Sequence, residues 1–230
     1  MKITPLGDSA LIVRVHSRDE SLDVVLDAVH KIGVAQIPGV VEVAPAYMSI
    51  GVFFDPMQVA TAGAGPAAIF DLVAEQIRQA VSRKTKSTKP TARLVKIPVC
   101  YDLEFALDLT DVAQHARLSA KQVVDLHQAA EYRVNCVGFT PGFPYLSGLP
   151  KKLATPRHAT PRKEIPAGSV AIGGAQTGIY PFRSPGGWNV IGRTPLQLFD
   201  PLKNPPALLR AGDRVRIRPI TRDEFNAFKK

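Results

Sequence analysis

Residues 138–146, with the sequence GFTPGFPYL, restrict the fold more than any other stretch of the chain. Two glycines permit positive φ, and two prolines fix φ and remove backbone donors, so the segment suits neither a helix nor a regular strand. Its aromatic side chains, Phe139, Phe143 and Tyr145, must therefore be presented from a rigid loop. We expect this loop to plug one end of a β-barrel, to wall a pocket or to contact a partner protein.

The composition is that of a globular protein, since 45% of the 230 residues are apolar and 21% are charged. Apolar runs are interrupted well short of the ~18 residues that a membrane span needs, and the first residues do not resemble a secretory signal. Cys100 and Cys136 are far apart and form no CxxC pattern. We therefore expect a cytoplasmic protein with no disulfide framework and no membrane partner.

The excess positive charge lies entirely in the second part of the chain. Residues 1–90 contain nine Lys/Arg and nine Asp/Glu, whereas residues 91–230 contain twenty and eleven, a difference of nine. Two basic clusters account for much of it: Lys151, Lys152, Arg157, Arg162 and Lys163, and then Arg210, Arg214, Arg216, Arg218 and Arg222. Such clusters bind anions or acidic partners in some proteins, but most basic surfaces are merely solvated.

Residues 1–84 are predicted to form a small α+β domain, followed by a polar basic linker at 85–91. Strands are expected at 9–15, 40–44 and 47–54. One helix, with a possible Ser17/Glu20 capping box, should end at Gly33, and a second should begin near Pro66. No group of residues in this domain suggests chemistry.

Residues 92–230 are predicted to form a β-barrel or sandwich domain. A strand at 93–100 precedes two short helices at 108–116 and 119–130, the second with a Ser119/Gln122 capping box. Short β-branched runs between Gly and Pro then predict strands at 169–172, 189–192, 196–199 and 214–220. In the last of these, Arg214, Arg216 and Arg218 alternate with apolar residues and should face outward.

The two short helices also resemble a helix-turn-helix motif over residues 111–124. Arg117 occupies the turn where such motifs usually carry Gly, and the second helix offers only Lys121 as a strong cation beside the acidic Asp125. An ordinary helical hairpin is therefore favoured, and we expect no nucleic-acid partner.

Four residues of the barrel domain are candidates for binding or catalysis. His127 follows Val123 by four residues, so it is either a core residue or an acid or base near a pocket. Gln176 and Tyr180 suit an amide or lactam, because both donate and accept without a charge, although structural turns explain them equally well. Arg193 could hold a carboxylate or form a salt bridge at the barrel rim.

Several familiar motifs are absent from the sequence. There is no Gly-Lys dipeptide and hence no Walker A loop, and the glycines at 173 and 174 do not open a G-x-G-x-x-G turn. There is no G-x-S-x-G elbow or HExxH pair, and the five histidines lack metal spacing. Any nucleotide must bind by other means or on another chain, and no metal site is expected.

Taken together, the motifs of the barrel domain resemble the family of KipI and the B component of 5-oxoprolinase (PxpB), also called allophanate hydrolase subunit 1. The resemblance covers the barrel domain almost from end to end, and residues 5–10 and 45–47 resemble the family's first domain. Its motifs are His127 with residues 132–134, 138–146, 154–157, 160–162, 166–170, 174–181, 184–188, 191–195, 198–201 and 212–215. One departure is Arg210-Ala-Gly, where Pro-Gly is usual.

The resemblance implies a fold and an activity. The fold is α+β: a small α/β-sandwich N-terminal domain plus a cyclophilin-like β-barrel C-terminal domain. The implied activity is that of the B component of a multi-subunit, ATP-dependent 5-oxoprolinase, which converts 5-oxo-L-proline to L-glutamate with ATP hydrolysis; this component is inactive when isolated. The implied partners are a KipA-like C component and a LamB/YcsF-like A component. ATP is expected to bind to these partners or at a site shared with them.

In this interpretation His127 is the catalytic candidate, and the substrate-binding candidates are Phe139, Phe143, Tyr145, Gln176, Tyr180 and Arg193. Two alternatives remain open. The chain could be a KipI-type inhibitor of a sensor histidine kinase, docked through its basic barrel face, or part of a urea/allophanate-type amidohydrolase.

Overall fold

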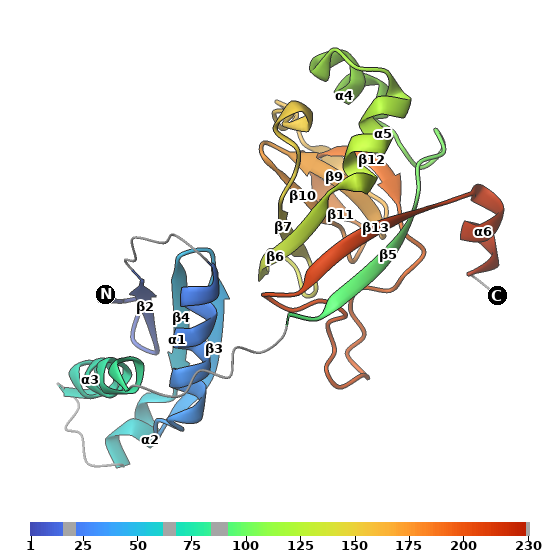
Figure 1. The fold of residues 1–230 in the computed structure, drawn as a ribbon. Coiled ribbons are helices and arrows are strands. Elements are labelled where there is room, and N and C mark those ends of the chain that lie inside the picture. Colours follow the sequence, from blue (N-terminus) through green and yellow to red (C-terminus); the bar gives the residue numbers. More distant parts are fainter. Residues whose placement is uncertain (16–21, 62–67, 84–91, 229–230) are drawn as a thin grey trace. The chain divides into compact units, whose positions relative to one another are not determined.

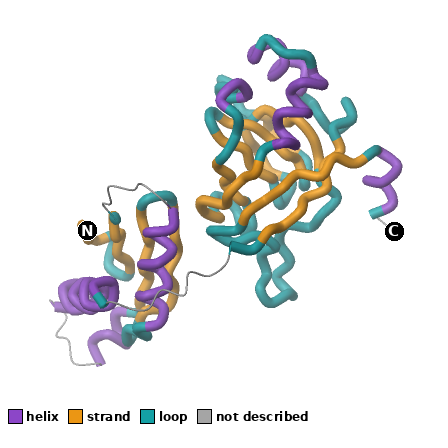
Figure 2. The backbone as a smooth tube through the Cα atoms, in the orientation of Figure 1, coloured by secondary structure: helices purple, strands orange, loops and turns teal. Residues whose placement is uncertain are grey.

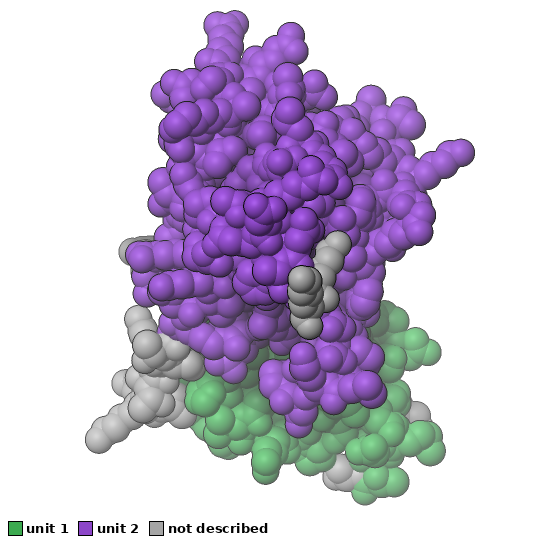
Figure 3. All heavy atoms as spheres, turned by 90° about the vertical axis from the view of Figure 1, so that its right-hand side faces the viewer, with its two compact units in different colours: residues 1–91 green, residues 92–230 purple. Residues whose placement is uncertain are grey.

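The computed structural model describes residues 1–15, 22–61, 68–83 and 92–228. The chain divides into two compact units, Met1–Thr91 and Ala92–Lys230, coloured separately in Figure 3. Three sequence predictions lie outside the described residues: the Ser17/Glu20 capping box, the helix start near Pro66 and the linker at 85–91.

The first unit is a four-stranded antiparallel sheet in the order β1-β2-β4-β3, packed against helices (Figure 1). Side chains of period two along β2 and β4, such as Leu11 and Val52, meet apolar residues of α1 and α3 such as Ile32 and Ile77 in one core. Its elements are β1 (Lys2–Pro5), β2 (Ala10–Arg14), α1 (Leu22–Val34), β3 (Val40–Ala46), β4 (Ser49–Phe54), α2 (Pro56–Thr61) and α3 (Ile69–Ser82).

The helix α2 is an element that the sequence analysis does not predict, because it takes Asp55-Pro56 only as the end of a strand. In the structure the Asp55 carboxylate accepts the backbone N–H of Met57 at 2.9 Å, and Pro56 occupies the first helical position. Both features are helix-start signals, so the sequence does contain the information for this helix.

The second unit is a closed barrel with strand order β10-β7-β6-β13-β5-β12-β9 (Figures 1 and 2). The strand β13 pairs in parallel with β5 and antiparallel with β6. The barrel strands are β5 (Leu94–Cys100), β6 (Glu131–Val137), β7 (Pro144–Ser147), β9 (Ser169–Gly173), β10 (Gln176–Ile179), β12 (Asn189–Arg193) and β13 (Arg214–Ile220). A two-stranded ribbon, β8 (Arg162–Ile165) with β11 (Ser184–Gly186), and a 3₁₀ turn at Lys151–Leu153 complete it.

The helices α4 (Leu109–Ala116) and α5 (Ala120–Ala129) form a hairpin on the barrel. The predicted capping box is confirmed: Ser119 accepts the Gln122 N–H, and the Gln122 side chain accepts the Ser119 N–H at 2.8 Å. Arg117 ends α4 with left-handed backbone, φ 55°, the conformation usually left to glycine. Val112 and Val123 enter the barrel core, so the apolar faces of both helices are used for packing.

A short helix, α6 (Arg222–Ala227), follows the last strand. Its Phe225 is buried against Phe105, with ring centroids 4.5 Å apart. Thr221 and Glu224 form a second capping box at its start. This helix therefore covers the end of β5, where Cys100 joins the same small apolar cluster.

The alternation predicted for residues 214–220 is confirmed, because Val215 is fully buried while Arg214 and Arg216 are exposed. Both arginines pair with Glu131 on the neighbouring strand, at 2.7 and 3.1 Å. The other members of this basic cluster also have acidic partners: Arg218 with Glu224, Arg222 with Glu104, and Arg210 with Asp213. Each arginine of the cluster therefore has an acidic partner, but Glu131 is shared by two of them and Asp213 also binds Arg93, so the face keeps a net positive charge.

The strand predicted at 196–199 is wrong. Only Phe199 makes an isolated bridge, to Ala207, and the Leu208 N–H donates to the Leu198 carbonyl within the same excursion of the chain. Proline at 195 and at 201 limits the segment on both sides, which prevents a longer ladder.

Candidate functional site

The barrel strands present alternate side chains to the inside and the outside of the barrel. On β10, Thr177 and Ile179 point inward, while Gly178 lies on the outer face beneath the Phe143 ring. On β9, Val170 and Ile172 belong to the inner core and Ala171 to a separate outer cluster. The outer face of β9, β10 and β12 is thus a floor for a second layer of side chains.

That layer is made of aromatic rings, here named the outer aromatic cluster: Phe139, Phe143, Tyr145, Tyr180 and Trp188. Phe143 is its centre, with ring centroids 4.9 Å from Tyr145, 5.2 Å from Tyr180, 5.6 Å from Trp188 and 5.8 Å from Phe139. All four contacts are edge-on or tilted, the geometry that aromatic quadrupoles favour.

Two glycines let the rings approach the barrel. A Cβ on Gly178 would lie 2.8 Å from the Phe143 ring, and a Cβ on Gly173 would collide with the indole of Trp188. No other residue type allows an aromatic ring to lie directly on the backbone at these positions. The glycine-rich stretch at 173–178 therefore serves the aromatic layer.

The members of the cluster differ in exposure. Phe143 and Tyr180 are each 2% exposed, whereas Phe139 is 64% exposed and has a φ of 72°. Tyr145 is half-buried. Burial raises the pKa of the Tyr180 hydroxyl, against a hydrogen bond with the Trp188 backbone, and burial likewise raises the pKa of Tyr145. A ligand would therefore meet Phe139 and Tyr145 first, with Phe143 and Tyr180 beneath them.

Arg157 lies over the edge of this cluster. Its guanidinium carbon is 5.4 Å from the centre of the Trp188 ring, within the range of a cation–π contact. The sequence places Arg157 in a basic cluster but gives no reason to pair it with Trp188. That contact depends on how the chain returns to the barrel after residue 180.

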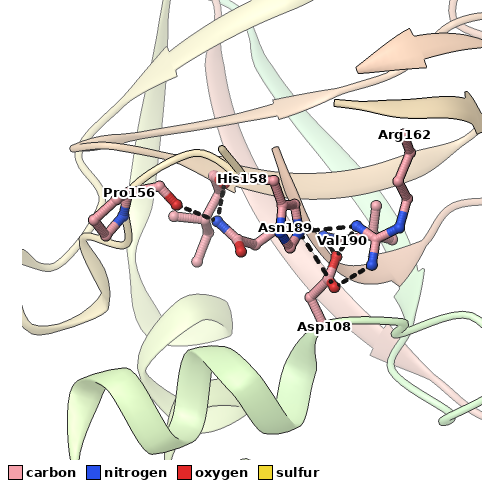
Figure 4. A network of polar contacts seen from close by, with 7 residues as sticks. Asp108, Pro156, His158, Arg162, Asn189 and Val190 are labelled. Carbon is pink, nitrogen blue, oxygen red and sulfur yellow. Dashed lines mark hydrogen bonds and ion pairs between the residues drawn. The ribbon is translucent and has the colours of Figure 1, made fainter. Parts of the chain in front are cut away.

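A buried polar network, shown in Figure 4, holds α4 to the barrel and to the ribbon. Asp108, fully buried, accepts Arg162 at 2.8 and 2.5 Å and the Val190 N–H at 2.7 Å. His158 Nε2 accepts from Arg162 at 2.9 Å, and Asn189 donates to the Pro156 carbonyl at 2.8 Å. The sequence does not single out Asp108 or His158, since neither lies in a motif that suggests a partner.

His127 lies inside the barrel and is fully buried. Its Nδ1 is 2.7 Å from the Tyr101 hydroxyl and its Nε2 is 3.2 Å from Thr177 Oγ1. Because Thr177 donates its own proton to the Ala171 carbonyl, Nε2 must donate to Thr177 and Nδ1 must accept from Tyr101. Burial lowers the pKa of His127 to about 3, so the ring is neutral at pH 7.

Arg193 lies at the end of β12, where its Nε donates to the Ala167 carbonyl at 2.8 Å. Its guanidinium carbon lies 5.9 Å from the centre of the Phe105 ring, and burial lowers its pKa. In the described part of the chain, no acidic side chain lies within 4.0 Å of it. Its terminal nitrogens are therefore free of the salt bridge that a rim position would favour.

The structure brings together four of the seven residues that the sequence suggests for a site: Phe139, Phe143, Tyr145 and Tyr180. Gln176 begins β10 opposite Gly173, two residues before the outward-facing Gly178, and is half-buried. His127 is inside the barrel, and the ring that Arg193 covers belongs to the Phe105 cluster. Their roles in binding or catalysis stay predictions.

The described residues contain no group of three or more His, Cys, Asp or Glu side chains able to hold a metal ion. The turn at 173–174 is also no phosphate cradle, because the Gly174 N–H donates to the Thr155 carbonyl at 2.8 Å and Trp188 covers Gly173. Across the described ranges, no helix is both long and apolar enough to cross a membrane.

Comparison of the sequence with known proteins identifies the family of the chain. Residues 1–209 match the family model described as "Carboxyltransferase domain, subdomain C and D". The chain belongs to this family. A relative from Bacillus subtilis, named as the B component of 5-oxoprolinase, is 42% identical over 231 residues, which is 99% of this chain and 96% of the relative. The resemblance that the motifs indicate is thus confirmed.

Solved structures share the fold. The structure titled TTHA0988 matches with a TM-score of 0.75 and 34% identity over 92% of this chain, which spans 40% of that longer chain. The urea amidolyase of K. lactis matches with a TM-score of 0.75 at 20% identity, over 98% of this chain and 15% of its own. The predicted fold class, α+β with a β-barrel second domain, is confirmed.

Proposed function

We propose that this chain is the B component of a multi-subunit, ATP-dependent 5-oxoprolinase, which converts 5-oxo-L-proline to L-glutamate. The observation that supports this most directly is the 42% identity to the B component of 5-oxoprolinase from Bacillus subtilis, over nearly the full length of both chains. In this proposal the enzyme is cytoplasmic, and the isolated chain is inactive because part of the site comes from its partners.

The substrate has two chemical halves, an uncharged lactam ring and a carboxylate. A small ring of this kind suits an apolar surface that carries a few neutral polar groups. The outer aromatic cluster offers such a surface: Phe139 and Tyr145 are accessible, and Phe143 is the buried ring beneath them. In this proposal Gln176 and Tyr180 orient the lactam. Gln176 contacts it directly, whereas the buried Tyr180 acts indirectly by packing against Phe143.

The lactam is a stable amide, so its activation by phosphoryl transfer would account for the ATP requirement. The glycine-rich turn at 173–174 does not fit a nucleotide phosphate, because the Gly174 amide is already paired with Thr155 and Trp188 covers Gly173. We therefore assign ATP to the partner proteins and derive no catalytic step through it on this chain.

His127 is the catalytic candidate of the sequence analysis, and its environment supports a structural role better. Both ring nitrogens are held, by Tyr101 and Thr177, and a pKa of about 3 leaves almost no imidazolium at neutral pH. A general acid or base would need access to the substrate and a pKa nearer the working pH. We propose that His127 fixes α5 to the inner wall of the barrel.

The proposed partners are a KipA-like C component and a LamB/YcsF-like A component. The solved chain titled TTHA0988 supports the idea that this unit works beside others, since the part similar to this chain spans only 40% of it. Phe139 is the residue of the 138–146 loop best placed for such a contact, being 64% exposed.

The direct experiment measures L-glutamate formed from 5-oxo-L-proline and ATP by the chain alone, by its co-encoded partners alone and by the full mixture. We expect activity only in the full mixture, with ADP released in step with glutamate. An inactive full mixture of folded proteins would overturn the proposal. Urea and allophanate, assayed in parallel, test the amidohydrolase alternative, for which the 20% identity to urea amidolyase supports only the fold.

The kinase-inhibitor alternative relies on a basic barrel face. That face carries less free charge than the sequence alone suggests, because Arg214 and Arg216 share Glu131, and Glu224 pairs with Arg218. Lowering of histidine-kinase autophosphorylation by the chain, with no glutamate formed in any mixture, would favour it over the enzyme.

A further inference from the structure

We propose that Arg157 is the residue that binds the substrate's carboxylate at the outer aromatic cluster, a role for which Arg193 is the candidate of the sequence analysis. The inference rests on the proposed function for the identity of the ligand. Its structural content is more general: a planar cation, without an acidic partner, is held at the edge of an apolar aromatic surface.

The first observation is charge. Arg157 is exposed, and among the described residues no carboxylate lies within 4.0 Å of it. The neighbouring arginines differ, because Arg162 is bound to Asp108 and Arg183 to Glu164. A guanidinium that has no internal acid keeps its donors for an external carboxylate, which it can hold with two parallel hydrogen bonds.

The second observation is position. The cation–π contact with Trp188 leaves the N–H groups at the guanidinium edge available while it restricts the plane of the group. Trp188 is itself fixed, 5% exposed and in edge contact with Phe143 and Tyr145. The cation is thus pre-oriented, which reduces the entropy lost on binding.

The third observation links Arg157 to the predicted lactam-binding residues. The positive charge of Arg157 acts on the hydroxyls of both Tyr145 and Tyr180, where it opposes the rise in pKa that burial causes. The geometry agrees for Tyr145, because Arg157 lies over the Trp188 ring and the Tyr145 ring is 5.8 Å from that same ring. A ligand with a carboxylate and a neutral amide could reach the exposed Arg157 and the half-buried Tyr145 at once, whereas Tyr180 is covered.

Arg193 lacks this position. Its contacts are the Ala167 carbonyl and the Phe105 ring, and Phe105 packs with Phe225 of α6 rather than with the outer aromatic cluster. The two arginines are therefore alternatives that a pair of variants can separate.

Trp188 provides the readout, since it is the only tryptophan in the chain. The full complex and the isolated chain are each titrated with 5-oxo-L-proline, and with 2-pyrrolidinone, the same ring without the carboxylate, while Trp188 emission is followed. Partner tryptophans, where present, are replaced or subtracted with a Trp188→Phe control. The variants are Arg157→Ala, Arg157→Lys and Arg193→Ala, with Arg183→Ala as a surface-charge control.

We expect Arg157→Ala to weaken binding of 5-oxo-L-proline about 10- to 100-fold, the loss typical of one charged hydrogen-bonded contact. The affinity of Arg157→Ala for 2-pyrrolidinone should change little. The affinity of Arg157→Lys for 5-oxo-L-proline should lie between those of the wild type and Arg157→Ala. Arg193→Ala and Arg183→Ala should bind 5-oxo-L-proline as the wild type does. In the active complex, KM for 5-oxo-L-proline should rise by the same factor with kcat nearly unchanged.

The inference is overturned if Arg157→Ala keeps the wild-type preference for the carboxylate, if Arg193→Ala loses it instead, or if no carboxylate changes Trp188 emission in any sample. These results are distinct from failure of the proposed function. An active complex with an unaltered KM in Arg157→Ala removes only the inference, whereas an inactive complex that still binds carboxylates through Arg157 removes only the function.

Discussion

The indole of Trp188 lies directly on Gly173, so closely that no side chain fits between them. We expect Gly173→Ala to displace the indole and to lower the free energy of unfolding by about 1–3 kcal/mol, the usual cost of overpacking. Urea unfolding and a shift in Trp188 emission measure both effects. Gly138→Ala is the matched control, because a Cβ there meets no atom within 4 Å. Equal stability of the two variants would contradict the packing described.

The ion pair of Asp108 and Arg162 should be far more important for stability than that of Arg183 and Glu164, although all but Asp108 come from the same ribbon region. Arg162→Ala leaves a fully buried carboxylate without its cation, and we expect a loss of about 3–5 kcal/mol. Arg183→Ala removes an exposed pair and should cost about 0–1 kcal/mol. Urea midpoints of the two variants, compared at one pH, test this; similar midpoints would show that Asp108 does not depend on Arg162.

His127 should make stability depend on pH in a known direction. With a pKa of about 3 in the folded chain and about 6.5 when unfolded, only the unfolded state gains a proton as pH falls between these values. Its stabilising contribution is thus complete above about pH 6.5 and is lost progressively toward pH 3. We expect the imidazole NMR signals of His127 to show an Nε2-H tautomer that does not titrate from pH 8 to pH 5. Titration near pH 6.5 would contradict the buried geometry.

The two phenylalanines of the 138–146 loop should separate folding from partner binding. Phe143→Ala opens a cavity at the centre of the cluster and should cost about 3–5 kcal/mol. Phe139→Ala should change stability by less than about 0.5 kcal/mol, because the ring is 64% exposed. If the loop contacts a partner, only Phe139→Ala weakens co-purification of the complex while the chain stays folded. A destabilised Phe139→Ala would instead assign this ring to the core.

The sequence predicts correctly those features that depend only on residues close together in the chain. The Ser119 capping box and the arginine alternation along 214–220 are both confirmed, because each depends on residues a few positions apart. The Leu196–Phe199 run resembles a strand in composition but has no ladder partner beyond one bridge. Strand formation depends on a distant partner, and composition does not specify that partner.

The site is predictable in kind and less so in arrangement. The glycines and prolines of the 138–146 loop are enough to draw attention to its aromatic residues. In the structure Phe143 contacts both Tyr180 and Tyr145. The contact of Arg157 with Trp188 joins residues 31 positions apart, which no periodicity of a helix or strand connects. The sequence allows His127 to be either a core residue or an acid or base near a pocket. The structure of the closed barrel shows that it is a buried core residue.

The parallel pairing of β13 with β5 joins the first and the last strand of the barrel, Leu94–Cys100 and Arg214–Ile220. During synthesis, β5 leaves the ribosome more than a hundred residues before its partner exists. Until then the barrel has an open seam, and the unpaired edges of β5 and β6 are available to other strands. Completion of the second unit therefore waits for residue 220, so the barrel closes only after nearly all of the chain has been synthesised.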